Sequence, residues 1–202
     1  SLPLTLSAYA ISESEYPEVT QYPDIYMPSS EYDVEIKKWM SEQAGKKDAY
    51  ENLSPNLNSF LTSSIPEFLS DTGTENRVYS PINVYMALSM LAELTDGDTR
   101  QQILDLVGQD SINTLRKEAN AVWNAHYSDD GRLTSILSSS IWLNENVGFN
   151  ESVMKTLSGN YYASSYRGNM ADPAFTKMLQ TWLNENTGGM LKDQIDGIEM
   201  DP

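Results

Sequence analysis

The sequence predicts a helix-rich α+β fold, and three observations support this prediction. Apolar residues recur at helical spacing in several segments between Leu57 and Leu183. Ser-Pro and Asp-Pro pairs precede two of these segments, which is typical of helix starts. Shorter stretches near residues 133–143 and 161–166 have the alternation and the β-branched or aromatic content of strands. With 202 residues, the chain can bury a hydrophobic core without disulfides or metals.

The first fifty residues differ from the rest of the chain. They contain six of the twelve tyrosines and four of the nine prolines, and no Lys or Arg precedes Lys37. We therefore expect an acidic extension over residues 1–50 and a domain over residues 51–202. Prolines exclude a continuous helix before residue 28, and Val34–Met40 is predicted to form a short helix. Two interpretations stay open: a poorly ordered leader, or an arm whose tyrosines pack on the body or on a partner.

Helices are predicted for the next part of the chain. Apolar residues from Leu57 to Leu69 form one stripe, although Pro66 should kink or restart this helix. Ser80 can cap the following helix and Pro81 suits its first turn. That helix is apolar nearly all round up to Leu94, so we expect neighbouring elements to enclose it.

Turn residues separate the elements that follow. The sequence Asp96-Gly97-Asp98-Thr99 predicts a turn before a helix with Ile103 to Val107, which Gly108 ends. Another helix is expected from about Ile112 to Tyr127, with Asp129-Asp130-Gly131 as the break after it.

The last third of the chain alternates predicted strands and helices. Leu133–Leu143 is predicted as a strand, and Asn150 caps a short helix up to Leu157. Tyr161–Tyr166 is predicted as a second strand. Asp172-Pro173 then opens a helix that ends near the sequence Thr187-Gly188-Gly189.

Composition excludes several function classes. The chain has 29 acidic and 13 basic residues, a formal charge of −16, which argues against binding nucleic acid or anionic lipid. No apolar run is long enough to span a bilayer. The absence of cysteine removes thiol nucleophiles and cysteine-ligated metals, and the single histidine, His126, cannot supply a two-histidine zinc motif.

We expect no cofactor and no metal. The carboxylates around Gly97 and Gly131 lack the spacing of a calcium loop, and turn chemistry explains both. Thr187-Gly188-Gly189 lacks the spacing and the following lysine of a phosphate-binding loop. No pattern pairs a nucleophile with a general base, so we expect that the chain is not an enzyme.

Residues 76–91 resemble a pattern of the serpin family. Asn76-Arg77-Val78-Tyr79-Ser80-Pro81-Ile82-Asn83-Val84, with Ala87-Leu88-Ser89-Met90-Leu91, is similar to the family's asparagine, short strand, Ser-Pro and buried helix B. Trp182, Thr187, Gly189 and Leu191 resemble the family's helix F and its Trp-x(4)-Thr-x-Gly-x-Ile signature. Matches in the same order lie between them, namely Gly97-Asp98-Thr99, Ala119-Asn120-Ala121-Val122-Trp123, Ile141-Trp142-Leu143 and Tyr162-Ala163.

The resemblance extends from about Leu53 to Ile198 and implies the N-terminal half of a serpin, with helices A to F and the first strands of sheets A and B. It implies that the reactive loop lies outside this chain. It also implies inhibition of serine-type endopeptidases by a suicide mechanism, in which a target protease cleaves that loop and the loop inserts into sheet A as a conformational switch.

Structural roles follow from the resemblance. Asn76, Ser80, Pro81 and Asn83 would lie in the shutter beneath the sheet that must open, where small polar groups can exchange hydrogen-bond partners. Trp182, Thr187 and Gly189 would belong to helix F, which covers the sheet and must yield to the loop.

The chain also departs from the family pattern. Asn83 replaces the usual serine, Gln180 replaces the usual asparagine before the tryptophan, and the turn after helix B lacks the common Leu-Gly-Ala. These departures leave the fold assignment intact and put efficient insertion in doubt.

Three functions therefore stay open: a protease inhibitor, a non-inhibitory serpin acting as a binding or carrier protein, and a free-standing acidic interaction domain. The expected partners are a target protease, a complementary C-terminal chain or a second copy. A half-serpin should expose apolar surface and strand edges. We expect an extracellular or cell-surface location.

Overall fold

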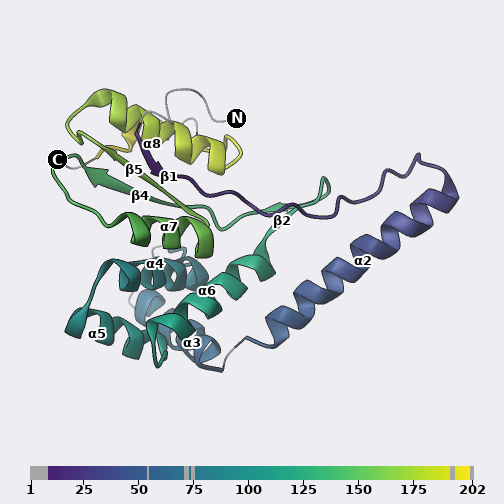
Figure 1. The fold of residues 1–202 in the computed structure, drawn as a ribbon, viewed down its shortest axis with the longest axis horizontal. Coiled ribbons are helices and arrows are strands. Elements are labelled where there is room, and N and C mark those ends of the chain that lie inside the picture. Colours follow the sequence, from purple (N-terminus) through teal and green to yellow (C-terminus); the bar gives the residue numbers. More distant parts are fainter. Residues whose placement is uncertain (1–8, 54, 71–72, 74–75, 192–193, 201–202) are drawn as a thin grey trace. The chain divides into compact units, whose positions relative to one another are not determined.

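The computed structural model describes residues 9–53, 55–70, 73, 76–191 and 194–200. Its elements form two compact units, one from Ser1–Tyr16 with Ser138–Pro202 and the other from Pro17–Leu137. Helices predominate over short strands in both, which confirms the predicted helix-rich α+β class (Figure 1). The organisation into an extension over 1–50 and a domain over 51–202 stays a prediction.

The first unit contains a sheet in the order β1-β5-β4. Strand β4 (Ser139–Asn144) runs parallel to β5 (Ala163–Gly168), and β1 (Ala10–Ser12) runs antiparallel along the other edge of β5. Parallel neighbours need a crossover connection, which helix α7 (Glu151–Asn160) provides. Strand β5 is thus the middle strand, which explains why five of its six residues are buried.

Helices α7 and α8 (Pro173–Asn186) cover opposite faces of this sheet, and a short 3-10 turn, Ile195–Gly197, follows α8 (Figure 1). Both helices begin at the predicted caps. The carboxamide oxygen of Asn150 accepts a hydrogen bond from the N–H of Ser152 at 2.9 Å, and the Asp172 carboxylate accepts one from the N–H of Ala174 at 2.8 Å.

The second unit is mainly helical. It contains a hairpin of β2 (Ser128–Asp129) and β3 (Thr134–Ser135), together with helices α2 (Ser29–Glu51), α3 (Pro55–Leu69), α4 (Pro81–Leu94), α5 (Gly97–Val107) and α6 (Ile112–His126). Gly108 ends α5 with a φ of 69°, in the left-handed region that glycine favours, as the sequence predicts.

Aromatic residues join the helices of the second unit. Trp123 of α6 is fully buried, stacks on Tyr127 with ring centroids 4.6 Å apart, and donates its indole N–H to the Leu137 carbonyl at 3.1 Å. Tyr85 of α4 packs on Phe60 of α3, so the core joins α3, α4 and α6.

Several sequence predictions need correction. The expected helix over Val34–Met40 is part of the much longer α2, because prolines are absent between Pro28 and Pro55 and ion pairs support the exposed turns, including Lys46 with Glu42 at 3.2 Å. Pro66 lies inside α3 without ending it.

The strand predictions also need correction. The short strand expected at Arg77–Tyr79 is not formed: residues 76–80 have neither helix nor strand structure, and Val78 is fully exposed. The expected strand over Leu133–Leu143 is split into β3 and β4. A strand needs a partner to bond its backbone, which a single segment of sequence does not reveal.

Helix α4 is less enclosed than predicted. Tyr85, Met86 and Met90 are buried, whereas Leu91 and Leu94 are 45% and 41% exposed. Apolar residues thus lie on the open side of this helix, where another polypeptide segment or another molecule can cover them.

The poorly ordered leader is the wrong interpretation for residues 9–28, and the packed arm is the right one. We call residues 9–28 the N-terminal arm. Tyr9 packs on Phe175 at 5.4 Å between ring centroids, and Tyr22 packs edge-on against Trp39 at 5.1 Å. Tyrosine rings therefore attach this segment to other elements of the chain.

Candidate functional site

The predicted shutter residues lie before and in the first turn of α4. The Ser80 hydroxyl accepts a hydrogen bond from the N–H of Asn83 at 3.5 Å, and the Ser80 carbonyl accepts one from the N–H of Val84 at 3.2 Å. Pro81 occupies the first helical position. The side chains of Asn76, Ser80 and Asn83 are exposed.

Exposure gives these side chains freedom to change partners. An exposed hydroxyl or amide can exchange a protein hydrogen bond for one to water at little cost, whereas a buried one cannot. The nearby Tyr79 shows the opposite case: its ring stacks on Phe68 at 4.3 Å, and its buried hydroxyl has no hydrogen-bond partner among the described residues. That Ser80 and Asn83 lie beneath a sheet stays a prediction.

Trp182 lies in the apolar cluster between α8 and the sheet. This cluster contains Tyr166, Phe175, Met178 and Trp182, all buried. The helix approaches the sheet closely at Gly168, where an added Cβ would lie 2.7 Å from the Phe175 ring. Sequence periodicity predicted that Trp182 faces the core of its unit, and the structure confirms it.

Thr187 and Gly189 shape the end of α8. The Thr187 hydroxyl donates to the Leu183 carbonyl at 2.7 Å, which satisfies a carbonyl in the last turn. Gly189 has a φ of 80°, and its N–H donates to the Asn184 carbonyl at 2.8 Å. A residue with a Cβ would be strained there, so the glycine of the signature has a local structural reason.

Gln180 makes a contact that an asparagine would be too short to copy in the same geometry. Its side-chain N–H donates to the Ile198 carbonyl at 3.0 Å, and the side chain is buried. The departure from the family pattern thus ties α8 to the segment that follows it.

In the described part of this unit, four buried polar atoms have no hydrogen-bond partner: the hydroxyls of Ser138 and Ser165, the Arg167 Nε and the carboxamide oxygen of Asn184. The Ser165 hydroxyl belongs to β5 and the Asn184 oxygen to α8. Buried unpaired groups cost free energy, so this helix-covered sheet is stabilised less than a fully paired one would be.

The single histidine has structural partners. The ring Nδ1 of His126 lies 2.8 Å from the Val122 carbonyl, and the ring packs edge-on against Tyr50. His126 is thus a packed residue, as predicted. Among the described residues, no group of three His, Cys, Asp or Glu side chains is placed to hold a metal ion.

The sequence prediction missed how the arm attaches. Strand β1 has only three residues, and the alternation in Tyr9-Ala10-Ile11-Ser12 is too short to stand out. It also missed the hairpin contact of Trp39, whose indole N–H donates to the Asp130 carboxylate at 2.9 Å. A buried carboxylate next to a turn glycine gives no separate signal in a sequence.

The comparisons with known proteins settle the class. A sequence model of the family Serpin (serine protease inhibitor) matches residues 55–202. Because this match covers well over half of the chain, the chain belongs to the serpin family. The resemblance inferred from the segments around Ser80 and Trp182 is confirmed.

Curated relatives agree with this assignment. Alpha-1-antiproteinase of Rattus norvegicus is 25% identical over 168 residues, which are 80% of this chain and 40% of the relative. Alpha-1-antitrypsin 1-1 of Mus musculus is 20% identical over 172 residues, 83% of this chain and 42% of the relative. Serpin-ZX of Arabidopsis thaliana is 22% identical over 125 residues, which are 59% of this chain and 32% of the relative. The chain thus spans about two fifths of the length of the first relatives.

Solved structures share the fold. Cleaved kallistatin, complexed with heparin, superposes with a TM-score of 0.62 at 19% identity, over 74% of this chain and 45% of kallistatin. The thermophilic serpin tengpin in its latent state superposes with a TM-score of 0.61 at 25% identity, over 73% of this chain and 39% of tengpin. The fold is therefore the helix-rich α+β part of a serpin. Among the described residues, no helix is both long and apolar enough to cross a membrane.

Proposed function

We propose that this chain is the N-terminal part of an inhibitor of serine proteases that works by loop insertion. The supporting observation is the family match over residues 55–202, which includes β4 and β5 of the first unit and the helices α7 and α8 that cover them. In this mechanism a target protease cleaves the reactive loop, and the loop then enters the sheet as a new strand. We propose that the reactive loop lies outside the matched residues.

The buried atoms around α8 support this proposal. A helix that must shift on its sheet should not be fully satisfied in one position, and the unpaired Ser165 and Asn184 groups meet that requirement. The large aromatic surface of Trp182 and Tyr166 can stay in contact while the helix slides, because such contacts are not strongly directional.

Incubation of the full-length protein with a panel of serine proteases tests the proposal. An adduct that survives SDS is the expected result, since the trapped protease is held covalently. Cleavage of the full-length protein without any adduct would contradict inhibition. Asn83→Ser, which restores the usual family residue, should raise the yield of adduct. Asn58→Ser, at an exposed asparagine outside the shutter residues, is the matched control.

A non-inhibitory serpin that acts as a binding or carrier protein is the second candidate. The bond from Gln180 to the Ile198 carbonyl favours it, because an additional buried hydrogen bond at α8 makes movement of this helix costlier. If this bond prevents insertion, Gln180→Asn should convert a full-length protein that is cleaved without trapping into one that holds the protease in an adduct. Cleavage without an adduct in both proteins would contradict this role of the bond.

A complementary C-terminal chain or a second copy is proposed as a partner of the second unit. A cavity of about 510 Å³ lies between α3, α4 and α5, and Phe60, Phe68, Val84, Leu88 and Leu106 give it an apolar lining. Phe68 and Leu106 are 51% and 60% exposed. Apolar surface of this kind gains free energy when another chain covers it.

The remaining parts of the proposal follow from family membership. We place the protein outside the cell or at its surface and assign it no catalytic activity of its own, no cofactor, no metal and no nucleic-acid partner. Detection of the protein in the medium of secreting cells, and its absence from the cytosolic fraction, tests the location.

A further inference from the structure

The outer edge of β5 is a place where an extended segment binds. Strand β5 carries a single charged residue, Arg167, and most of its length is buried. A strand edge with so few charges pairs readily with a free strand, so proteins normally cover it. Here residues of the N-terminal arm do so: the N–H of Arg167 donates to the Tyr9 carbonyl at 2.9 Å, and β1 continues antiparallel to β5.

Side chains add selectivity to this backbone pairing. The Ser12 hydroxyl donates to the Ser158 hydroxyl of α7 at 2.8 Å. The N–H of Ser14 donates to the buried Ser164 hydroxyl at 3.1 Å. Tyr9 also contacts Phe175. The site therefore contacts a tyrosine and the two serines that lie three and five positions after that tyrosine in the sequence.

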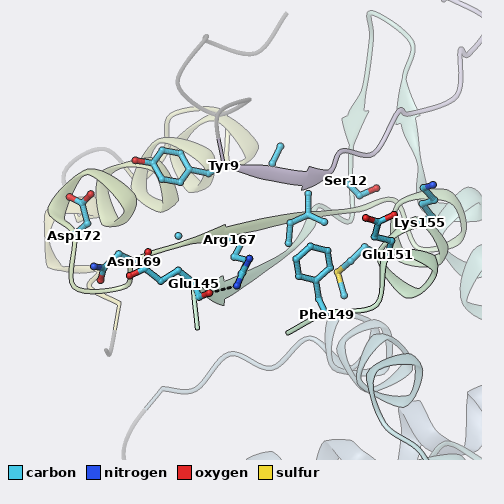
Figure 2. A pocket seen from close by; sticks show the side chains of 13 residues that line it. Tyr9, Ser12, Glu145, Phe149, Glu151, Lys155, Arg167, Asn169 and Asp172 are labelled. Carbon is cyan, nitrogen blue, oxygen red and sulfur yellow. Dashed lines mark hydrogen bonds between the residues drawn. The ribbon is translucent and has the colours of Figure 1, made fainter. Parts of the chain in front are cut away.

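Residues of the arm line an open pocket of about 770 Å³ (Figure 2). Arm residues from Tyr9 to Ser12 form one wall, and Phe149, Met154 and Arg167 lie among the groups opposite. The Arg167 guanidinium lies 5.6 Å from the Phe149 ring centre and donates a hydrogen bond to the Glu145 carbonyl.

The attachment is also short. Strand β1 has three residues, and its register with β5 shifts between Ala10 and Ser12. The residues from Pro17 to Asp24 that follow form neither helix nor strand. Short, irregular pairing opens more easily than a core strand.

From these observations we propose that the edge of β5, with Phe175, Ser158 and Ser164, is a strand-addition site specific for the pattern Tyr-x-x-Ser-x-Ser, and that residues 9–14 of the same chain occupy it. The arm is then an exchangeable ligand of its own body. This inference does not rest on protease inhibition.

The first test exploits the absence of cysteine from the chain. In the double variant S12C/S158C the new thiols replace hydroxyls 2.8 Å apart, so oxidation should form a disulfide within one chain that migrates as a monomer on a non-reducing gel. S12C/T156C is the control, since residue 156 lies about 200° around the helix from residue 158. A disulfide-linked dimer would assign the site to a second copy and overturn occupation in cis.

The second test measures exchange. The full chain carrying S158C is mixed with an eight-residue peptide of residues 9–16 that has, in place of Ser12, a cysteine activated as a mixed disulfide with a small thiol. The thiolate introduced by S158C attacks the peptide sulfur and the small thiol leaves, so capture needs no oxidant. The arm competes with the peptide for the edge of β5, and its tether gives it a high effective concentration there. Y9A should weaken binding of the arm, so disulfide capture of the peptide should be at least about tenfold faster in S158C/Y9A than in S158C. A scrambled peptide with cysteine at the same position should be captured slowly in both proteins.

Each outcome of the second test bears on the site. Equal capture of the correct and scrambled peptides by S158C/Y9A would overturn sequence-specific recognition. Equal capture by S158C and S158C/Y9A would overturn occupation of the site by the arm. Thermal melting of both proteins verifies that Y9A leaves the body folded, and S158C/Y9F, which keeps the ring, should behave like S158C.

Discussion

Asp130 is the residue on which the second part of the arm converges. Its carboxylate accepts hydrogen bonds from the N–H groups of Arg132 and Leu133 at 2.9 and 2.8 Å and from the Trp39 indole at 2.9 Å. Its carbonyl accepts the N–H of Tyr22 at 2.8 Å. One buried residue thus holds together the hairpin, the arm and α2.

Replacement of Asp130 tests this role. A carboxamide has one acceptor oxygen where the carboxylate has two, so we expect Asp130→Asn to lower the free energy of unfolding by about 1–3 kcal/mol. Asp129→Asn is the matched control, because the Asp129 carboxylate is exposed and accepts a hydrogen bond from the Thr134 hydroxyl at the surface. Urea denaturation of the three proteins measures the difference. Equal stabilities of the two variants would contradict the role of Asp130.

Asp130 also predicts a dependence of stability on pH. Burial opposes its ionisation, but the hydrogen bonds from Leu133, Trp39 and Arg132 outweigh burial and hold the pKa of Asp130 below its usual value. The ionised group therefore stabilises the folded state above the unfolded-state pKa, and this contribution is lost as pH falls through the folded-state pKa. Between pH 7 and about pH 3, wild type should lose more free energy of unfolding than Asp130→Asn does. Parallel loss in both would refute this prediction.

At the scale of elements, α8 and β5 are held together by close approach. Gly168→Ala would place a Cβ 2.7 Å from the Phe175 ring, so we expect a loss of about 1–3 kcal/mol in the free energy of unfolding. Gly159→Ala, in α7, meets no atom within 4 Å and should instead stabilise by about 0.5–1 kcal/mol. Denaturation of both variants distinguishes packing from helix propensity, and a neutral Gly168→Ala would show that α8 can move away freely.

Elements differ in how well the sequence predicted them. Helices α5 to α8 were predicted near their observed bounds, because caps such as Asn150 and Asp172 and apolar periodicity are local signals. Helix α2 was predicted much too short, since it has no buried residue and hence no apolar stripe. Strand β1 was not predicted at all, because its pairing with β5 joins segments about 150 residues apart.

At the scale of the whole molecule, a formal charge of −16 favours solubility, while the apolar groove of α3, α4 and α5 favours association. We expect the purified chain to self-associate at micromolar concentration. Leu106→Glu should shift the weight-average mass in sedimentation equilibrium toward the monomer. Val147→Glu, at an exposed apolar residue of the first unit, is the matched control and should leave the mass unchanged. Equal effects of both variants would point to charge alone.

By itself, the sequence determined the class of this protein: acidic, helix-rich α+β, and a serpin over residues 55–202. Caps, turn glycines and apolar periods act over a few residues, so they can be read along the chain. The tertiary structure alone decided that the arm is attached, that β5 is a middle strand and that Asp130 is buried. Those features depend on which distant segments of the chain come into contact. Bringing such segments together costs conformational entropy, so the sum of many tertiary contacts determines which of them pack together.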